Sequence, residues 1–254
     1  MNFNPDSGDY AQDEFCAYVD GFNLYKGVLE RRPDLKWLNL VSLAQELRPR
    51  LRLKHLYYFT APLKERFPGD ESPQMQEKYL RVLSNQGISV IRGKFRKSTT
   101  WLRVSSTLRT KVISPTVPGH FGLTQRAFNF SAKVADPDLP KAQVWKMEEK
   151  GSDVNLASYL LRDAYSGLKN ALVISGDSDL VTPVLFSVEA GVDVRVAVPN
   201  RSIQTAALRN VASSLVKLQP KELRRHLLSR VFITTSGGNI VRPDSWANEE
   251  RAQQ

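Results

Sequence analysis

The segment 171–180, with the sequence ALVISGDSDL, constrains the fold more than any other part of the chain. Four consecutive apolar residues that end in a small-residue turn are typical of a parallel strand buried on both faces. Open α/β sheets bind their ligands at the carboxyl ends of such strands, so Asp177 and Asp179 are expected at a ligand-binding edge. Two close carboxylates repel one another unless a cation or a proton intervenes. The alternative is that either aspartate only caps the helix expected to begin near Leu180.

Strand-like and helix-like segments alternate on both sides of this central strand. Further apolar, β-type runs occur at residues 15–19, 55–59, 88–91 and 193–197. Helices are expected over residues 40–47, 180–190, 202–213 and 221–228, together with helices that begin at Ser72 and Ser152. This alternation predicts a mainly parallel sheet of about five strands in a three-layer α/β/α, Rossmann-like domain. Short β-type runs at 231–234 and 240–241 predict a C-terminal hairpin.

The composition fits a soluble globular chain, with 41% hydrophobic and 24% charged residues among 254. No run of about 18 apolar residues occurs, and the N-terminus is acidic and unlike a signal peptide, so a cytoplasmic location is expected. Cys16 is the single cysteine, which excludes an internal disulfide and a cysteine-cluster zinc site. We expect disordered tails at 1–13 and 247–254, and one domain over 14–246 that carries an insertion or lid at 93–140.

The net charge of +10 is concentrated in residues 78–135, which contain no acidic residue. A segment with charges of one sign favours a polyanionic partner, and nucleic acid is the expected one. The charge alone would also fit a membrane surface or an oligomer contact, but no membrane partner is expected. Aromatic residues interleaved with the cations could stack on the bases of a single strand, or could form a small core of the insertion. The candidate nucleic-acid contacts are Lys94, Arg96, Lys97, Trp101, Arg103, Arg109, Lys111 and Lys150.

Three separate segments deliver acids or amides to the same expected edge of the sheet. Asp20 and Asn23 follow the first strand, Asp153 opens the helix before the central strand, and Asp177 and Asp179 follow that strand. In a doubly wound sheet, the first strand and the strand after the reversal of order flank one crevice. An oxygen-ligand cluster without histidine or cysteine suits Mg²⁺ or Mn²⁺ rather than zinc.

These same segments resemble the NYN domain family, which comprises PIN-like metal-dependent ribonucleases. The residues YVDGFNLY at 18–25, EEKGSDVNLA at 148–157 and SGDSDL at 175–180 look like its three signature blocks. The residues YYFTAP at 57–62 and IVRPDSW at 240–246 are similar to its bacterial branch. The resemblance implies a PIN-like α/β/α fold and an acidic site made of Asp20, Asp153, Asp177 and Asp179, supported by Asn23.

The activity that this resemblance implies is metal-dependent endoribonuclease action on phosphodiester bonds of single-stranded or structured RNA. Asp20, Asp153 and Asp177 would contact the metal directly, and Asp179 would bind through water or orient Asn23. An RNA-binding or regulatory protein with little catalysis on the same fold is the alternative. A haloacid-dehalogenase-like phosphatase would require Asp-x-Asp after the first strand, and a Toprim-like nuclease would require a glutamate there; neither pattern is present.

Overall fold

The computed structural model describes residues 10–65, 67–103, 141–199 and 205–247. The chain divides into two units, and each is described by itself. The first unit combines Met1–Phe95 with Glu149–Gln254, and the second is Arg96–Glu148.

A six-stranded sheet forms the centre of the first unit, and all of its neighbouring strands are parallel. Its strand order is β3-β2-β1-β6-β7-β8, so the order reverses between β1 and β6. The strand β1 is buried along its whole length because it lies in the middle of the sheet. The strands are β1 (Glu14–Asp20), β2 (Arg52–Thr60), β3 (Ser89–Arg92), β6 (Asn170–Ile174), β7 (Asp193–Val198) and β8 (Ser214–Lys217).

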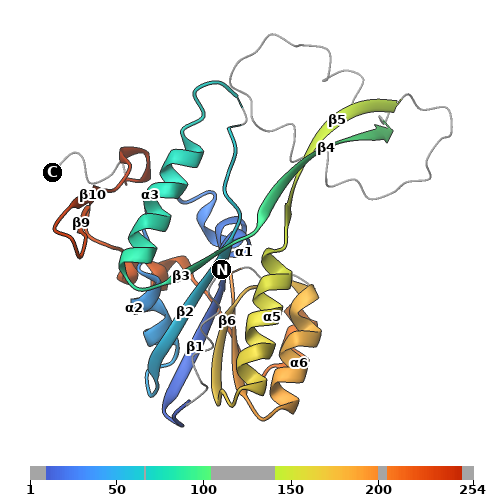
Figure 1. Ribbon diagram of the computed structural model, residues 1–254, viewed down its shortest axis with the longest axis vertical. Helices are drawn as coiled ribbons and strands as arrows, with labels where there is room; N and C mark the ends of the chain where they lie inside the picture. Colours follow the sequence, from blue (N-terminus) through green and yellow to red (C-terminus); the bar gives the residue numbers. More distant parts are fainter. Residues whose placement is uncertain (1–9, 66, 104–140, 200–204, 248–254) are drawn as a thin grey trace. The chain divides into compact units, whose positions relative to one another are not determined.

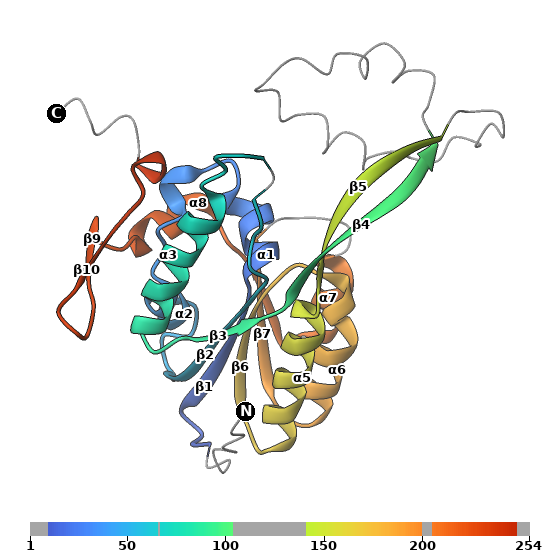
Figure 2. The same ribbon diagram turned by 45° about the horizontal axis from the view of Figure 1, so that its top comes forward.

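Helices cover both faces of this sheet, which confirms the predicted three-layer α/β/α fold (Figure 1). The helices α2 (Leu40–Leu47) and α3 (Ser72–Asn85) cover one face. The other face carries α5 (Ser152–Tyr165), α6 (Val181–Glu189) and α7 (Thr205–Val211), as Figure 2 shows. Each face has its own hydrophobic core, one around Trp37 and Leu43 and the other around Leu160 and Val184.

Two details of the sheet and its helices differ from the sequence prediction. The sixth strand, β8, was not expected, because its four residues form no long apolar run; three of them are partly buried and Lys217 is exposed. The helix expected at 221–228 is shorter: α8 (Pro220–Leu223) continues only as a 3₁₀ turn, Arg224–His226. It ends there because Leu227 is extended and forms a β-bridge with Leu38.

Two further pairs of strands lie outside the main sheet. The expected C-terminal hairpin is present as β9 (Val231–Ile233) and β10 (Asn239–Val241), which pair antiparallel. The strands β4 (Lys94–Arg103) and β5 (Lys141–Lys150) form a separate two-stranded sheet. Most of the expected insertion at 93–140 lies outside the described residues. So do most of the predicted tails, of which only residues 10–13 and 247 are described.

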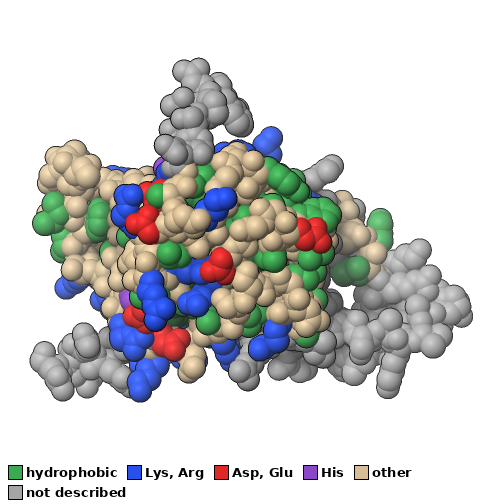
Figure 3. Space-filling model, turned by 90° about the horizontal axis from the view of Figure 1, so that it is seen from below, with side chains coloured by type: hydrophobic (Ala, Val, Ile, Leu, Met, Phe, Trp, Pro, Cys, Tyr) green, Lys and Arg blue, Asp and Glu red, His purple; other side chains and the backbone are tan. Residues whose placement is uncertain are grey.

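The edge of the main sheet at the amino ends of the strands carries both signs of charge. Acidic and basic side chains lie side by side in Figure 3, which views the molecule from the end where the strands begin. Glu14 pairs with Arg52 and Lys54, and Arg48 pairs with Asp193. The opposite charges within these ion pairs neutralise one another at this edge of the sheet.

Within the ranges that the structure describes, no helix has both the length and the apolar character needed to cross a membrane.

Candidate metal centre

The candidate site lies where the strand order reverses, at the carboxyl ends of β1 and β6. The two strands pair in parallel, with Val19 opposite Ile174. Asp20 is the last residue of β1, and Ser175 directly follows β6. The segments that follow β1 and β6 therefore leave the sheet side by side and turn away toward helices, which opens a crevice at this edge.

Three carboxylates meet at this crevice. Asp20, Asp153 and Asp177 each offer one oxygen, and these oxygens all lie within 4.8 Å of one another. Asp153 is in the first turn of α5. Asp20 is buried, Asp177 is partly buried and Asp153 is exposed, so the group reaches from the protein interior to the solvent. The structure thus brings together the three residues expected to contact a metal, and their role as ligands stays a prediction.

A buried serine holds two of these carboxylate-bearing residues in place. The Ser175 hydroxyl donates to Asp20 Oδ2 at 2.8 Å and accepts a hydrogen bond from the Asp177 backbone N–H at 3.1 Å. Asp20 Oδ1 accepts a second hydrogen bond from the backbone N–H of Asn23, at 2.8 Å. Sequence reasoning missed Ser175; the signal available was a hydroxyl at the end of an otherwise apolar buried strand.

Asn23 and Asp179 lie beside this group in different roles. Asn23 Oδ1 accepts a hydrogen bond from the Gly176 backbone N–H at 2.9 Å, so this backbone orients the amide. The Asp179 backbone N–H donates to Asp177 Oδ1 at 3.0 Å. Asp177 therefore caps the 3₁₀ turn Ser178–Leu180, as the simpler alternative proposed, while its carboxylate also belongs to the cluster. Asp179 is exposed and lies outside the three-carboxylate group.

The electrostatics of the site favour a cation. Although Asp153 as a residue is exposed, its carboxylate is partly shielded from water in the crevice. This desolvation, together with the negative charges of Asp177 and Asp179, raises the pKa of Asp153 above its ordinary value. A divalent ion would relieve this repulsion, and three carboxylate oxygens are the donor set that Mg²⁺ and Mn²⁺ accept. The residues present therefore fit the predicted ion.

Two glycines allow the backbone to pack closely around the site. A β-carbon on Gly21 would lie 2.5 Å from the Tyr58 ring and 2.9 Å from the Phe59 carbonyl oxygen. A β-carbon on Gly93 would lie 2.8 Å from the Lys150 carbonyl oxygen and 2.7 Å from the Ser152 hydroxyl. Gly21 thus allows α1 (Gly21–Leu24) to pack closely against β2. Gly93 allows the segment after β3 to pack closely against the start of α5.

The structure describes only part of the predicted nucleic-acid contacts. Lys94 and Lys150 are exposed and belong to the first unit, and Trp101 is 63% exposed in the second unit. Arg96, Lys97 and Arg103 lie on β4, whereas Arg109 and Lys111 lie outside the described residues. RNA as a partner is tested by none of these observations and stays a prediction.

Comparison with known proteins gives one relative of named activity. The chain is 26% identical over 264 residues to 6-hydroxy-3-succinoylpyridine 3-monooxygenase HspA of Pseudomonas putida (strain DSM 28022 / S16). The match covers 93% of this chain and 76% of that protein. Among solved structures, a protein of unknown function from Vibrio parahaemolyticus RIMD 2210633 matches with a TM-score of 0.46 and 16% identity, over 85% of this chain and 97% of that chain.

No protein-family model matches the chain, so membership of the NYN family stays a prediction. The relative corrects the functional prediction, however. It is a monooxygenase, which points to an oxidoreductase rather than to a ribonuclease or a non-catalytic RNA-binding protein. The comparison thus gives no support to the expected nuclease, hydrolase and RNA-binding functions. The physical reason for the error is that a carboxylate cluster selects a cation, whereas the chemistry depends on the substrate brought to that cation.

Proposed function

We propose that the chain is a metal-dependent oxidoreductase whose reaction takes place at the cluster of Asp20, Asp153 and Asp177. The observation that carries the proposal is the meeting of three carboxylate oxygens within 4.8 Å at the reversal of strand order. The similarity to a monooxygenase over 93% of the chain supports the class of reaction. By analogy with that relative, the proposed substrate is a small hydroxylated aromatic compound, and the reaction is insertion of one oxygen atom from O₂.

The three carboxylates would hold the ion from one side and leave its other positions to water or substrate. Bound there, either ion would supply a Lewis acid, and Mn²⁺, unlike Mg²⁺, would also supply a change of oxidation state. Ser175 and the Asn23 backbone N–H fix the plane of the Asp20 carboxylate through hydrogen bonds of 2.8 Å each. The chain therefore presents a preorganised oxygen-ligand set to the ion, so little reorganisation is needed when the ion binds.

The first experiment tests the metal site by itself. Calorimetric titration of the purified protein with Mn²⁺ and Mg²⁺ should give saturable binding of at least one ion. Asp177→Asn should weaken that binding at least about tenfold, because it removes one charged ligand from a three-carboxylate set. The matched control is Glu189→Gln, which removes an exposed carboxylate at the end of α6 and should bind the ion as the wild type does. Absence of saturable binding by the wild type would refute the metal site.

The second experiment tests the class of reaction. The metal-loaded protein is incubated in air with 6-hydroxy-3-succinoylpyridine and with NADH or a reduced flavin as the source of two electrons. We expect substrate-dependent oxygen consumption and, with ¹⁸O₂, a product that carries one ¹⁸O atom, detected by mass spectrometry; the second oxygen atom leaves as water with the two electrons of the reductant. Asp20→Asn and Asp177→Asn should abolish both signals, and Glu189→Gln should retain them. A protein that binds the metal but consumes no oxygen with any hydroxylated aromatic substrate would contradict the oxidoreductase assignment.

A further inference from the structure

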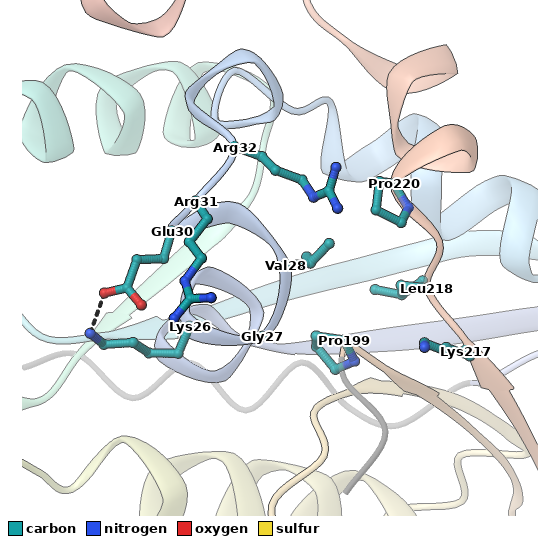
Figure 4. Close-up of a pocket in the computed structure, with 10 residues that line it drawn as sticks. All are labelled: Lys26, Gly27, Val28, Glu30, Arg31, Arg32, Pro199, Lys217, Leu218 and Pro220. Atoms are coloured by element: carbon teal, nitrogen blue, oxygen red, sulfur yellow. Dashed lines mark hydrogen bonds and ion pairs between the residues drawn. The ribbon is translucent and has the colours of Figure 1, made fainter. Parts of the chain in front are cut away.

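A second concave site lies on the same edge of the main sheet as the carboxylate cluster. It is a cavity of about 280 Å³, drawn in Figure 4. One wall is the π-helical turn Tyr25–Leu29, which directly follows α1, and the residues after it up to Arg32. The other wall is formed where β7 and β8 end, by Pro199, Lys217 and the residues that follow Lys217. Both walls follow the carboxyl ends of strands of the main sheet, so the cavity lies at the carboxyl edge of the sheet.

The side chains around this cavity are strongly basic. Its charged lining consists of one acid, Glu30, and four cations, Lys26, Arg31, Arg32 and Lys217. Glu30 is already paired with Lys26. Within the described part of the chain, the side chains of Arg31, Arg32 and Lys217 form no ion pair or hydrogen bond. Three positive charges are therefore left without compensation around one small cavity.

Two arginines of the turn Arg224–His226, in contrast, have acidic partners. Arg224 pairs with Asp34 at 3.1 Å, and Arg225 pairs with Glu46. The cavity also has apolar walls, because Val28 and Leu218 are buried and Pro199 and Pro220 line it. Figure 4 shows the Arg32 guanidinium extending between Val28 and Pro220. Arg31, Arg32 and Lys217 are all exposed, so an oxyanion from the solvent can reach them.

We infer that this cavity binds the acidic group, a carboxylate or a phosphate, of a small-molecule substrate whose other end reacts at the carboxylate cluster. Planar guanidinium groups donate two parallel hydrogen bonds to either oxyanion. The volume of about 280 Å³ suits a small molecule. The cavity begins where β7 ends, two strands from β1, so the cavity and the cluster lie on the same edge of the sheet.

This inference rests on the proposed function for its link to the reaction, but binding of the oxyanion is testable without it. The probes are succinate and inorganic phosphate, each titrated calorimetrically into the wild-type protein in the presence of EDTA. The test variant is Arg32→Gln/Lys217→Gln. The matched control, Arg50→Gln/Lys169→Gln, removes the same charge from two exposed cations at the amino edge of the sheet.

We expect saturable binding of at least one probe by the wild type and by the control. The test variant should bind that probe at least about tenfold more weakly, because two charge-assisted contacts are lost. Tighter binding of succinate would identify a carboxylate site, and tighter binding of phosphate a phosphate site. Absence of saturable binding of both probes, or equal losses in the test variant and the control, would overturn the inference.

Kinetics then test the link to the reaction. With the substrate of the second experiment, the test variant should raise KM at least about tenfold and change kcat less than about twofold, with Mn²⁺ affinity unchanged. An unchanged KM together with weakened oxyanion binding would overturn the claim that the substrate uses this cavity. If no turnover is found at all, the proposed function fails, while the titrations still decide whether the cavity binds oxyanions.

Discussion

At the scale of single residues, Ser175 shows how a neutral side chain organises a charged site. It is completely buried, and its hydroxyl links Asp20 to the backbone that carries Asp177. Two of the three clustered carboxylate-bearing residues are therefore positioned by one hydroxyl group. Buried polar groups are costly when they lose their partners, so this link contributes to stability as well as to the geometry of the site.

Ser175→Ala should lower the free energy of unfolding by about 1–3 kcal/mol, because the Asp177 N–H and the Asp20 carboxylate each lose a partner. It should also weaken Mn²⁺ binding by about tenfold or more, since second-shell partners hold ligands in place. Urea unfolding and calorimetric titration measure the two effects. Ser187→Ala is the control: Ser187 is equally buried, but its hydroxyl bonds to the Pro183 carbonyl inside α6. Wild-type metal affinity in Ser175→Ala would contradict this role.

At the scale of elements, a polar contact joins α2 to the turn Arg224–His226. The buried His226 lies 2.8 Å from Glu46 through Nε2 and 2.8 Å from the Ser42 hydroxyl through Nδ1. Arg225 donates to the same glutamate. Its hydrogen bond, with the nearby positive charges of His226 and Arg225, lowers the pKa of Glu46 below its ordinary value of 4.5.

A lowered pKa means that Glu46 stabilises the fold while it is ionised and loses this contribution as pH falls through the folded-state pKa. Glu46→Gln should therefore reduce the loss of unfolding free energy between about pH 5 and pH 3. The difference should stay below about 1 kcal/mol, because Glu46 is 43% exposed and solvent screens the pair. Urea unfolding at a series of pH values measures it, with Glu189→Gln as control. A steeper acid dependence in Glu46→Gln than in the wild type would contradict the prediction.

The same elements show what the sequence predicts well and what it does not. The sequence predicts α2 over residues 40–47, because Asn39 is a typical capping residue and Pro49 helps to end the helix. The structure confirms this range, and the side chain of Asn39 accepts a hydrogen bond from the Ser42 N–H. The strand β8 was missed because an edge strand needs no long apolar run. The convergence of the three acids could be expected from the strand order. The basic cavity could not, because its lysines and arginines come from distant segments without a shared pattern.

At the scale of the whole chain, an aromatic cluster ties the last described turn to the first half of the molecule. Trp246, in the turn Asp244–Trp246, packs 6.1 Å from Trp37 and 6.2 Å from Tyr79, measured between ring centroids. Trp37 also donates its indole N–H to the Ser229 carbonyl at 2.9 Å. Aromatic contacts of this kind hold the C-terminal hairpin region on the α2–α3 side of the sheet.

Trp246→Ala should destabilise the protein by about 3–5 kcal/mol, because it leaves a large cavity against two other aromatic rings. Urea unfolding followed by circular dichroism measures the loss. Phe186→Ala, on the exposed side of α6, is the control and should cost less than about 1 kcal/mol, since its side chain is 44% exposed. A comparable loss in both variants would show that Trp246 does not anchor this end of the chain.

The central place of β1 also affects how the protein is made. Asp20 and its partner Ser175 are 155 positions apart, and a ribosome adds about 5–20 residues per second. For about ten seconds or longer, the nascent chain therefore carries an apolar strand whose second neighbour has not yet been synthesised. Until then, one edge of β1 is unpaired and can pair with other chains. We therefore expect the yield of native protein to depend on how well the cell shields the N-terminal half of the nascent chain.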